Sequence, residues 1–314
     1  MDVIGLGALN IDLIYEADCS FLGKEHGRER QGKDGEEKSL LHILKKKGKL
    51  KAKSGGGSSA NTIYALAQMG FSCGYVGKVG KDKHGNFLLR GLKKAGVDTK
   101  EIKRDEQSGL CLILLDEVGE RTIFVFPNAN DKLSFSEIDI NYFNKAKFLH
   151  MSSFLGRTPF EAEKEIARKV KIKISFDPGE PHASRGLEEL TPILERTFIF
   201  FPTEKEVEIL TNKDYKKGSR ELLKYGIEII ACKLGEKGSY ILSKTEEIRI
   251  PAEKVKAVDT IGAGDVYAAG FLAGLLHGFN LHRSAKLATE LAAKSITGYG
   301  RENYPVKQDF LSFT

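Results

Sequence analysis

The chain has 314 residues, enough for one large α/β domain or two average domains with a full hydrophobic core. Hydrophobic residues make up 41% of the chain, which is ordinary for a globular protein, and no apolar run is long enough to span a membrane. The start, Met1 to Gly5, lacks the basic region and long apolar stretch of a signal peptide, so we expect a cytoplasmic protein without a membrane partner.

Strand-like runs recur along the chain and alternate with helical stretches such as Ser58 to Met69 and Thr158 to Val170. This alternation predicts a three-layer αβα fold with a doubly wound, mostly parallel sheet, whose ligands bind at the carboxyl ends of the strands. The expected strands are Asp2 to Gly7, Cys73 to Val79, Lys147 to Met151, Lys173 to Asp177, Phe198 to Phe201 and Glu228 to Cys232.

Two regions break this alternation, Leu13 to Glu16 and Gly109 to Phe126, and both look like strands that pair as hairpins. The second is expected to turn at residues 116–120. We interpret them as a small β lid that excludes water when it closes. Because no repeat or low-complexity linker is present, we predict a single domain, 1–314, with lid excursions at about 13–53 and 109–126.

The net charge of +6 is concentrated in one segment, Lys24 to Lys53, which holds eleven Lys or Arg and five Asp or Glu. A run this basic could contact nucleic acid, but it contains no aromatic residue that would stack on bases. We therefore expect no nucleic-acid partner. We interpret the segment as a solvated helix face followed by an edge strand that lysines protect. A further alternative is that the segment covers an anionic ligand.

Four cysteines are scattered without the spacing of a metal site, mostly within apolar segments, so we expect reduced core residues: Cys19, Cys73, Cys111 and Cys232.

Two competing motifs are incomplete. Gly5 to Asn10 has Asn10 where a dinucleotide fingerprint needs its third glycine, and Gly27 to Asp34 has Asp34 where a Walker A loop needs Ser or Thr. A phosphate site would have to be built another way.

Residues Asp259 to Asp265, Asp-Thr-Ile-Gly-Ala-Gly-Asp, offer that other way. An apolar helix, Ala263 to Leu276, begins there, so the free N–H groups of its first turn can surround an anion and Gly262 and Gly264 leave space for it. Asp265 could take a proton from an attacking hydroxyl while the amides of Gly262, Ala263, Gly264 and Asp265 stabilise the transferred group. The alternative is purely structural, with a tight glycine turn and a carboxylate that complements the helix N-terminus.

This motif resembles the C-terminal signature of the PfkB, or ribokinase-like, family of carbohydrate and nucleoside kinases. A second segment, Gly55 to Thr62 followed by Tyr75 to Asp82, is similar to the family's N-terminal signature. The resemblance extends from Asp12 to about Tyr304. It implies an ATP-dependent, Mg²⁺-requiring kinase that phosphorylates a primary hydroxyl with Asp265 as the general base.

Further site residues are implied by the same resemblance. Asp12, Gly56, Gly57 and Asn61 would contact the sugar, although Asp12 could equally be a turn residue and Asn61 a plain first-turn residue. Residues Thr297 to Tyr304 would line an adenine pocket. The remaining ATP-binding residues would be Lys233, Gly235, Gly238, Thr260, Gly262 and Gly264.

A metal site is implied near Pro202 to Glu206, where Glu206 matches the family's Asn-x-x-Glu motif and Thr203 replaces the usual Asn. Glu206 would hold Mg²⁺ largely through water, or be an exposed residue of a helix's first turn. Asp259 and Ile261 are at positions where relatives hold a monovalent cation such as K⁺. Arg121, on the expected lid hairpin, would reach the phosphates on closure or be a surface charge.

The acceptor is left open by the sequence. The long insertion and the run Ser54 to Thr62 favour the adenosine-kinase-like branch, with a free sugar as the alternative. A non-catalytic sensor of sugar or nucleotide is the alternative of another class, against which the retained Asp265 argues. The family resemblance also implies a homodimer, because lids with an exposed β face often pair.

Overall fold

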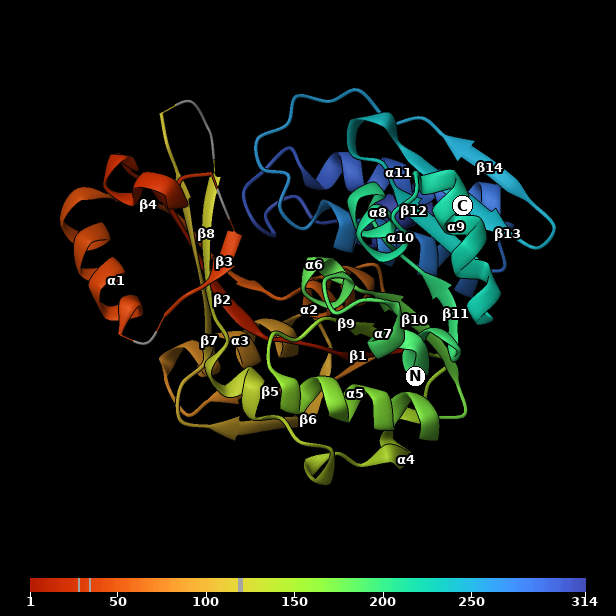
Figure 1. Cartoon of the computed structure of the whole chain (residues 1–314), viewed down its shortest axis with the longest axis horizontal. Helices are drawn as coiled ribbons and strands as arrows, with labels where there is room; N and C mark the ends of the chain where they lie inside the picture. The colour runs from red at the N-terminus through yellow and green to blue at the C-terminus, as the bar shows by residue number, and fades with distance from the viewer. Residues whose placement is uncertain (28, 34, 118–120) are drawn as a thin grey trace.

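The computed structural model describes residues 1–27, 29–33, 35–117 and 121–314. Its centre is a nine-stranded sheet in the order β14-β13-β12-β11-β10-β9-β1-β5-β6 (Figure 1). The strands are β1 (Val3–Leu6), β5 (Cys73–Gly80), β6 (Asp98–Asp105), β9 (Phe148–Ser152), β10 (Lys173–Asp177), β11 (Thr197–Phe200), β12 (Ile229–Lys233), β13 (Ser239–Ser243) and β14 (Glu247–Ile250).

From β6 to β12 all neighbouring strands of this sheet are parallel, and only β13 and β14 are antiparallel. The mostly parallel sheet expected from the sequence is therefore confirmed. Because parallel strands all end at the same edge, β1, β10 and β12 present their carboxyl ends to one place.

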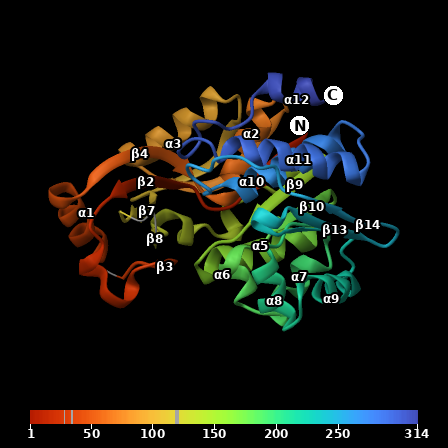
Figure 2. The same cartoon turned by 90° about the horizontal axis from the view of Figure 1, so that it is seen from above.

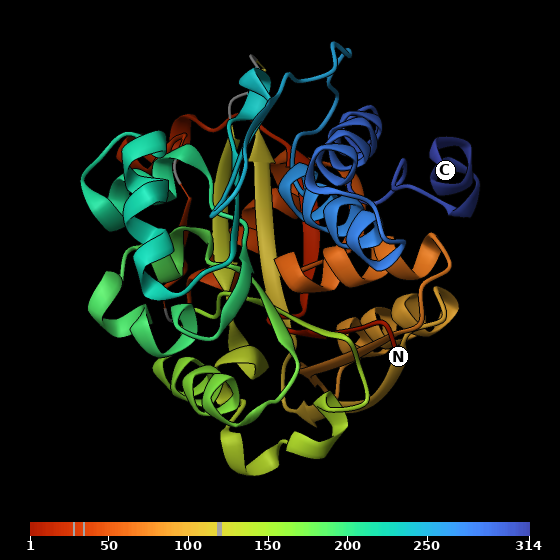
Figure 3. The same ribbon diagram turned by 90° about the vertical axis from the view of Figure 1, so that its right-hand side faces the viewer.

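Helices cover both faces of the sheet, which makes the three layers visible in Figures 2 and 3. The helices are α1 (Glu36–Lys47), α2 (Ser58–Gln68), α3 (Lys83–Lys94), α4 (Ile140–Phe143), α5 (Arg157–Lys169), α6 (Gly179–Ala183), α7 (Leu187–Leu194), α8 (Glu204–Thr211), α9 (Tyr215–Leu222), α10 (Ala263–Leu276), α11 (Leu281–Ser295) and α12 (Lys307–Phe313). Short 3₁₀ segments are Ser20–Glu25, Asn128–Lys132, Phe135–Glu137, Leu223–Tyr225 and Gly235–Lys237.

Each face of the sheet has its own hydrophobic core, because successive strand side chains point to opposite faces. In β1, Val3 belongs to the cluster that includes residues of α2, α10 and α11, whereas its neighbour Ile4 belongs to the cluster that includes residues of α5 and α7. Both side chains are fully buried. Continuous apolar strands are what a sheet covered on two sides requires.

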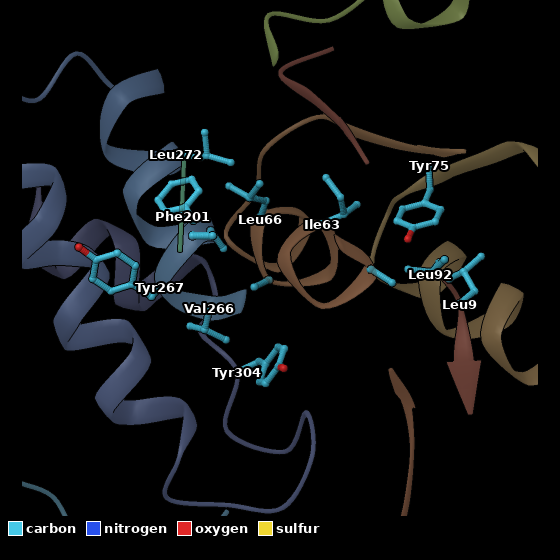
Figure 4. Packing of buried hydrophobic residues seen from close by; sticks show 14 of the residues in the cluster. Leu9, Ile63, Leu66, Tyr75, Leu92, Phe201, Val266, Tyr267, Leu272 and Tyr304 are labelled. Carbon is cyan, nitrogen blue, oxygen red and sulfur yellow. The ribbon is translucent and has the colours of Figure 1, made fainter. Parts of the chain in front are cut away.

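Helix α10 is apolar around its whole circumference because other elements surround it. Gly270 and Gly274 let it approach α11 closely, since a Cβ on either would lie 2.7 Å and 2.8 Å from the nearest Cα of that helix. Figure 4 shows Leu272 of α10 near Leu66 of α2, and Val266 of α10 beside Tyr304, in one buried cluster. The buried helix expected for this motif is confirmed, and its N-terminus is held rigidly.

A second, five-stranded sheet in the order β3-β8-β7-β2-β4 stands to one side of the larger one (Figures 1 and 2). Its strands are β2 (Asn10–Glu16), β3 (Glu29–Gln31), β4 (Lys49–Gly56), β7 (Gly109–Leu115) and β8 (Arg121–Phe126). The hairpin expected within Gly109 to Phe126 is confirmed, with Leu115 paired to Arg121. Residues 118–120 of its expected turn lie outside the described residues.

Strand β2, expected as part of a hairpin, forms no tight one. It runs parallel to β7 and antiparallel to β4, from which the long segment 17–48 separates it. That segment contains α1, so the basic region is a helix followed by an edge strand, as preferred from the sequence. Assignment of this sheet as a lid within a single domain stays a prediction.

The cysteines form no disulfide within the described residues, and Cys19, Cys73 and Cys232 are buried as expected. Cys111 differs, because it is only half-buried and lines a cavity between the two sheets. Across the described ranges, the structure contains no helix with the length and apolar character needed to cross a membrane.

Candidate active site

A cavity of about 480 Å³ lies between the carboxyl edge of the large sheet and the inner face of the small sheet. Its walls combine a polar end near α2 and α10 with an apolar face contributed by β7 and β8. The lining residues that carry the argument below are Asp12, Asn61, Asp265, Ile113, Ile123 and Val125.

Asp265 occupies the first turn of α10 and faces this cavity. Its Oδ1 accepts a hydrogen bond from Ser58 Oγ at 2.7 Å, and its Oδ2 accepts one from Asn61 Nδ2 at 2.8 Å. Burial, with the nearby charge of Asp177, raises the pKa of Asp265 from 3.8 to about 6. The carboxylate is thus held in one orientation and made more basic than an ordinary aspartate.

Gly262 ends the loop before α10 and adopts φ +79°, a left-handed conformation that favours glycine. A Cβ there would lie 2.2 Å from the Tyr304 hydroxyl, so both backbone and space demand glycine. The N–H of Ala263 is bonded to Thr260 O at 3.3 Å. The N–H groups of Gly262, Gly264 and Asp265 have no hydrogen-bond partner within the described part of the chain, which leaves them available to an anion.

Lys233 and Asp177 form an ion pair at the strand ends beside α10, with Nζ and Oδ2 2.5 Å apart. Lys233 ends β12 and Asp177 ends β10, so the parallel sheet itself brings them together. Burial would lower the pKa of Lys233, but the carboxylates of Asp177, Glu206 and Asp265 outweigh it and raise that pKa. Lys233 therefore stays cationic next to Gly264, whose Cβ, if present, would lie 3.2 Å from Nζ.

A second cleft, of about 530 Å³, is lined by this lysine. It is lined by Lys233, Leu234 and Gly235 after β12, by Gly264, and by Thr203, Glu204, Lys205 and Glu208 around the start of α8. Gly235 and Gly238 both have positive φ, at +59° and +91°, which shapes the turn between β12 and β13. The predicted nucleotide-side residues Lys233, Gly235 and Gly264 therefore meet in one cleft.

Glu206 is buried, not exposed, in the first turn of α8. Its Oε2 accepts a hydrogen bond from the Thr203 N–H at 2.8 Å, and Thr203 Oγ1 accepts one from the Glu206 N–H at 3.2 Å. This reciprocal pair is a capping box, which gives Thr203 a structural role at the position where Asn was expected. Burial raises the pKa of Glu206, while the positive charge of Lys233 opposes that rise.

The predicted sugar-binding residues also meet at the polar end of the cavity. Asp12 is a buried residue of β2, not a turn residue, and Gly56 leaves room for it, since a Cβ there would lie 2.1 Å from its Oδ2. Gly57 has φ +98° and packs against the carbonyl of Ala8. Asp12, Gly57 and Asn61 line the cavity, whereas Gly56 shapes it from behind.

Arg121 extends from β8 to the loop before α10. Its Nη1 donates to Thr260 Oγ1 at 2.8 Å, and its Nη2 lies 3.2 Å from Asp259 Oδ1. Asp259 also accepts hydrogen bonds from the N–H groups of Ile261 and Gly300 at 3.0 Å and 3.1 Å. The small sheet is therefore tied directly to the loop that shapes the anion site.

The family model described as "pfkB family carbohydrate kinase" matches residues 39–308. This chain belongs to the pfkB family of carbohydrate kinases. It is therefore a phosphotransferase that acts on an alcohol group. The resemblance expected from the two sequence motifs is confirmed.

Two relatives of this pfkB kinase illustrate the range of the family. An "uncharacterized sugar kinase" of Archaeoglobus fulgidus is 39% identical over 249 residues, 78% of this chain and 99% of that protein. An "ATP-dependent ribose-1-phosphate kinase" of Halopiger xanaduensis is 30% identical over 262 residues, 83% of this chain and 86% of that protein.

Solved structures share the fold over almost the whole pfkB chain. A ribokinase from Thermotoga maritima has a TM-score of 0.80 and 26% identity, and covers 100% of this chain and 99% of that one. An adenosine kinase from Sinorhizobium meliloti has a TM-score of 0.86 and 25% identity, and covers 99% and 98%. The ribokinase-like α/β fold is therefore confirmed.

Sequence reasoning missed three side chains that organise the kinase site. Asp177 could have been found, because it ends a predicted parallel strand, where ligands of such sheets bind. Ser58 was considered only as a helix start, although it holds Asp265. Arg301 falls in the segment predicted to line an adenine pocket, but its Nε donates to Asn61 Oδ1 at 2.9 Å. No sequence pattern predicts that contact.

Proposed function

We propose that this pfkB kinase transfers the γ-phosphoryl group of ATP to a primary hydroxyl of a sugar or nucleoside, with Asp265 as the general base. One observation carries the proposal: consecutive residues of one helical turn open into the two clefts. Asp265 lines the cavity between the sheets, and Gly264 lines the cleft beside Lys233. An acceptor in the first and a nucleotide in the second would meet at the N-terminus of α10.

The state of Asp265 suits proton removal. At neutral pH a carboxyl group with a pKa of about 6 is mostly ionised, yet it binds a proton far better than an ordinary aspartate. Its hydrogen bonds to Ser58 and Asn61 use one lone pair on each oxygen, so each oxygen can still accept an acceptor's hydroxyl.

The transferred group needs positive charge around its oxygens, and the site offers several sources. The N–H groups of Gly262, Gly264 and Asp265 lie at the positive end of the α10 dipole. Lys233 stands beside Gly264 and stays protonated. We propose that these groups hold the phosphates, and that Arg121 contributes through its contact with Thr260 when the small sheet covers the cavity.

For Mg²⁺, we propose Glu206 as a ligand that acts largely through water, with the phosphates as the other ligands. No cluster of three or more His, Cys, Asp or Glu that could hold a metal was found in the described residues. A site with one or two carboxylates fits Mg²⁺, which usually keeps several of its waters. Asp259 already accepts hydrogen bonds from two backbone N–H groups and pairs with Arg121. We therefore propose no cation requirement at Asp259 and Ile261, but include K⁺ in the assay to test for one.

The acceptor is proposed to be a sugar or a ribonucleoside. The polar end, with Asp12 and Asn61, suits hydroxyl groups. The apolar wall of Ile113, Ile123 and Val125 is an additional feature that favours a nucleoside, because it could cover the face of a base.

We further propose a cytoplasmic homodimer. Four cysteines that form no disulfide within the described residues suit a reducing compartment. Leu50 in strand β4 of the small sheet is 48% exposed, and an exposed apolar side chain there is suited to packing against a second copy. Light scattering would test the dimer, and a monomer at micromolar concentration would contradict it.

The function is tested by measuring ADP production with ATP, Mg²⁺ and K⁺ against nucleosides, free sugars, sugar acids and sugar phosphates. We expect strong turnover on one acceptor class, and turnover about 10²- to 10⁴-fold lower with the Asp265→Asn protein. If no acceptor on the panel stimulates ADP production while ATP binds, the alternative of a non-catalytic sensor is favoured. Turnover that is equal with and without K⁺ would exclude a functional monovalent cation at Asp259 and Ile261.

A further inference from the structure

Arg301 approaches the site from the C-terminal segment behind α2. Its Nε donates to Asn61 Oδ1 at 2.9 Å, and its guanidinium carbon lies 4.5 Å from the centre of the Tyr64 ring. Gly55 makes room for it, because a Cβ there would lie 2.9 Å from Nη1. The stacking on Tyr64 and the space left by Gly55 hold the Arg301 side chain in one position, so its hydrogen bond to Asn61 has a defined direction.

This contact decides which end of the Asn61 amide faces the catalytic side. A guanidinium group has only donors, so the amide atom that faces Arg301 must be the oxygen. The amide nitrogen then faces Asp265, where Nδ2 donates to Oδ2 at 2.8 Å. In the reversed orientation the amide oxygen would face the carboxylate and repel it.

We propose that Arg301 is a positioning residue: through Asn61 it orients the Asp265 carboxylate and stabilises its ionised form. This inference rests on the proposed role of Asp265. Arg301 does not line the cavity between the sheets, and so it acts through Asn61 and not on the acceptor.

Other groups around Asp265 set the background against which this contact acts. Asp177 from β10 disfavours the ionised form, and Lys233 from β12 favours it. Tyr304 and Tyr75 also interact electrostatically with Asp265, and Arg301 itself with Asp12. None of them sets the direction of the Asn61 amide. Among the described residues, only Arg301 and Asp265 form hydrogen bonds with that amide group.

The test is the pH dependence of kcat in an Arg301→Met protein, assayed with the acceptor turned over fastest. Methionine keeps an unbranched stem against Tyr64 but removes every donor. We expect the acid limb of the kcat profile to move up by about one pH unit, so that turnover near pH 6 falls about fivefold while KM changes little. Arg283→Met is the matched control, because Arg283 also stacks on a ring, at 3.9 Å from the centre of Phe279, without contacting Asn61. Its profile should stay unchanged.

A double-mutant cycle separates positioning from general packing. Asn61→Ala should shift the acid limb in the same direction, and adding Arg301→Met to it should shift the limb no further. An unshifted limb in the folded Arg301→Met protein, or additive shifts, would overturn the proposal. If the methionine variant does not fold, Arg301→Lys keeps a donor-only cation and should show a smaller shift than Asn61→Ala.

The same shift can be read without turnover. Urea unfolding would compare the free energy of unfolding of wild type with that of Asp265→Asn, and of Arg301→Met with that of the double variant. The pH at which this difference changes should be higher in the Arg301→Met background. Failure here is distinguishable from failure of the proposed function. An active Asp265→Asn protein contradicts the base, whereas an inactive one together with an unshifted Arg301→Met profile contradicts only the role of Arg301.

Discussion

The environment of Asp265 should cost the folded protein stability, and Asp265→Asn should remove that cost. The substituted amide can donate to Ser58 Oγ and accept from Asn61 Nδ2, so the local hydrogen bonds survive. The pKa of Asp265 rises from 3.8 to about 6 on folding, a difference of about 2 units. At about 1.36 kcal/mol per unit, this corresponds to about 3 kcal/mol at most, and we expect about 1 to 3 because the side chain is partly exposed.

The sign follows from proton binding. Below the unfolded pKa of 3.8 both states are protonated and the wild-type protein carries no penalty. As the pH rises from 3.8 to about 6, the unfolded chain releases this proton while the folded carboxyl group still holds it, so the wild-type protein loses stability relative to the variant.

Urea unfolding of both proteins between about pH 4.5 and pH 7.5 measures this difference. We expect Asp265→Asn to gain on the wild-type protein as the pH rises and the gain to level off above about pH 7. If the difference in the free energy of unfolding does not change with pH, the raised pKa of Asp265 is refuted, whatever the size of that constant difference.

Two further predictions concern neighbouring residues. Gly262→Ala should lower kcat/KM by about 100-fold or more and cost about 1 to 3 kcal/mol, because its φ of +79° and the contact with Tyr304 exclude a side chain. Gly91→Ala in α3 is the control, since its Cβ would meet nothing within 4 Å and should be neutral or slightly stabilising; equal losses in both proteins would contradict the reasoning. Glu206→Gln should raise the Mg²⁺ concentration for half-maximal activity about fivefold or more without unfolding α8, because glutamine still completes the capping box with Thr203. An unchanged Mg²⁺ titration would remove Glu206 from the metal site.

Much of the fold could be predicted because each apolar strand of the large sheet is covered on both faces. Runs such as Val3–Leu6 are then continuously apolar in the sequence, and so is the surface of α10. The edge strands β6 and β14 were missed because they lack such an apolar run. They are rich in charged residues, as the edges of sheets commonly are, and carry little apolar pattern.

The candidate site was predictable only where its residues are neighbours in sequence. The loop from Asp259 to Asp265 builds its own turn and amide cluster, so its chemistry is readable locally. The pair Lys233 and Asp177 is separated by 56 positions, and Arg301 and Asn61 by 240, so these contacts depend on strand order and on how the last segment returns to α2. Periodicity indicates which face a residue occupies but not which partner it meets there.

The most direct test of the account is the turnover of Asp265→Asn at saturating ATP and acceptor, beside wild-type protein of equal folded fraction. We predict that kcat falls about 10²- to 10⁴-fold while the KM for the acceptor changes little, because the carboxylate is needed for proton removal more than for binding. A folded variant that keeps kcat within about threefold of wild type would contradict Asp265 as the general base, since that change is far below the usual size of a general-base effect.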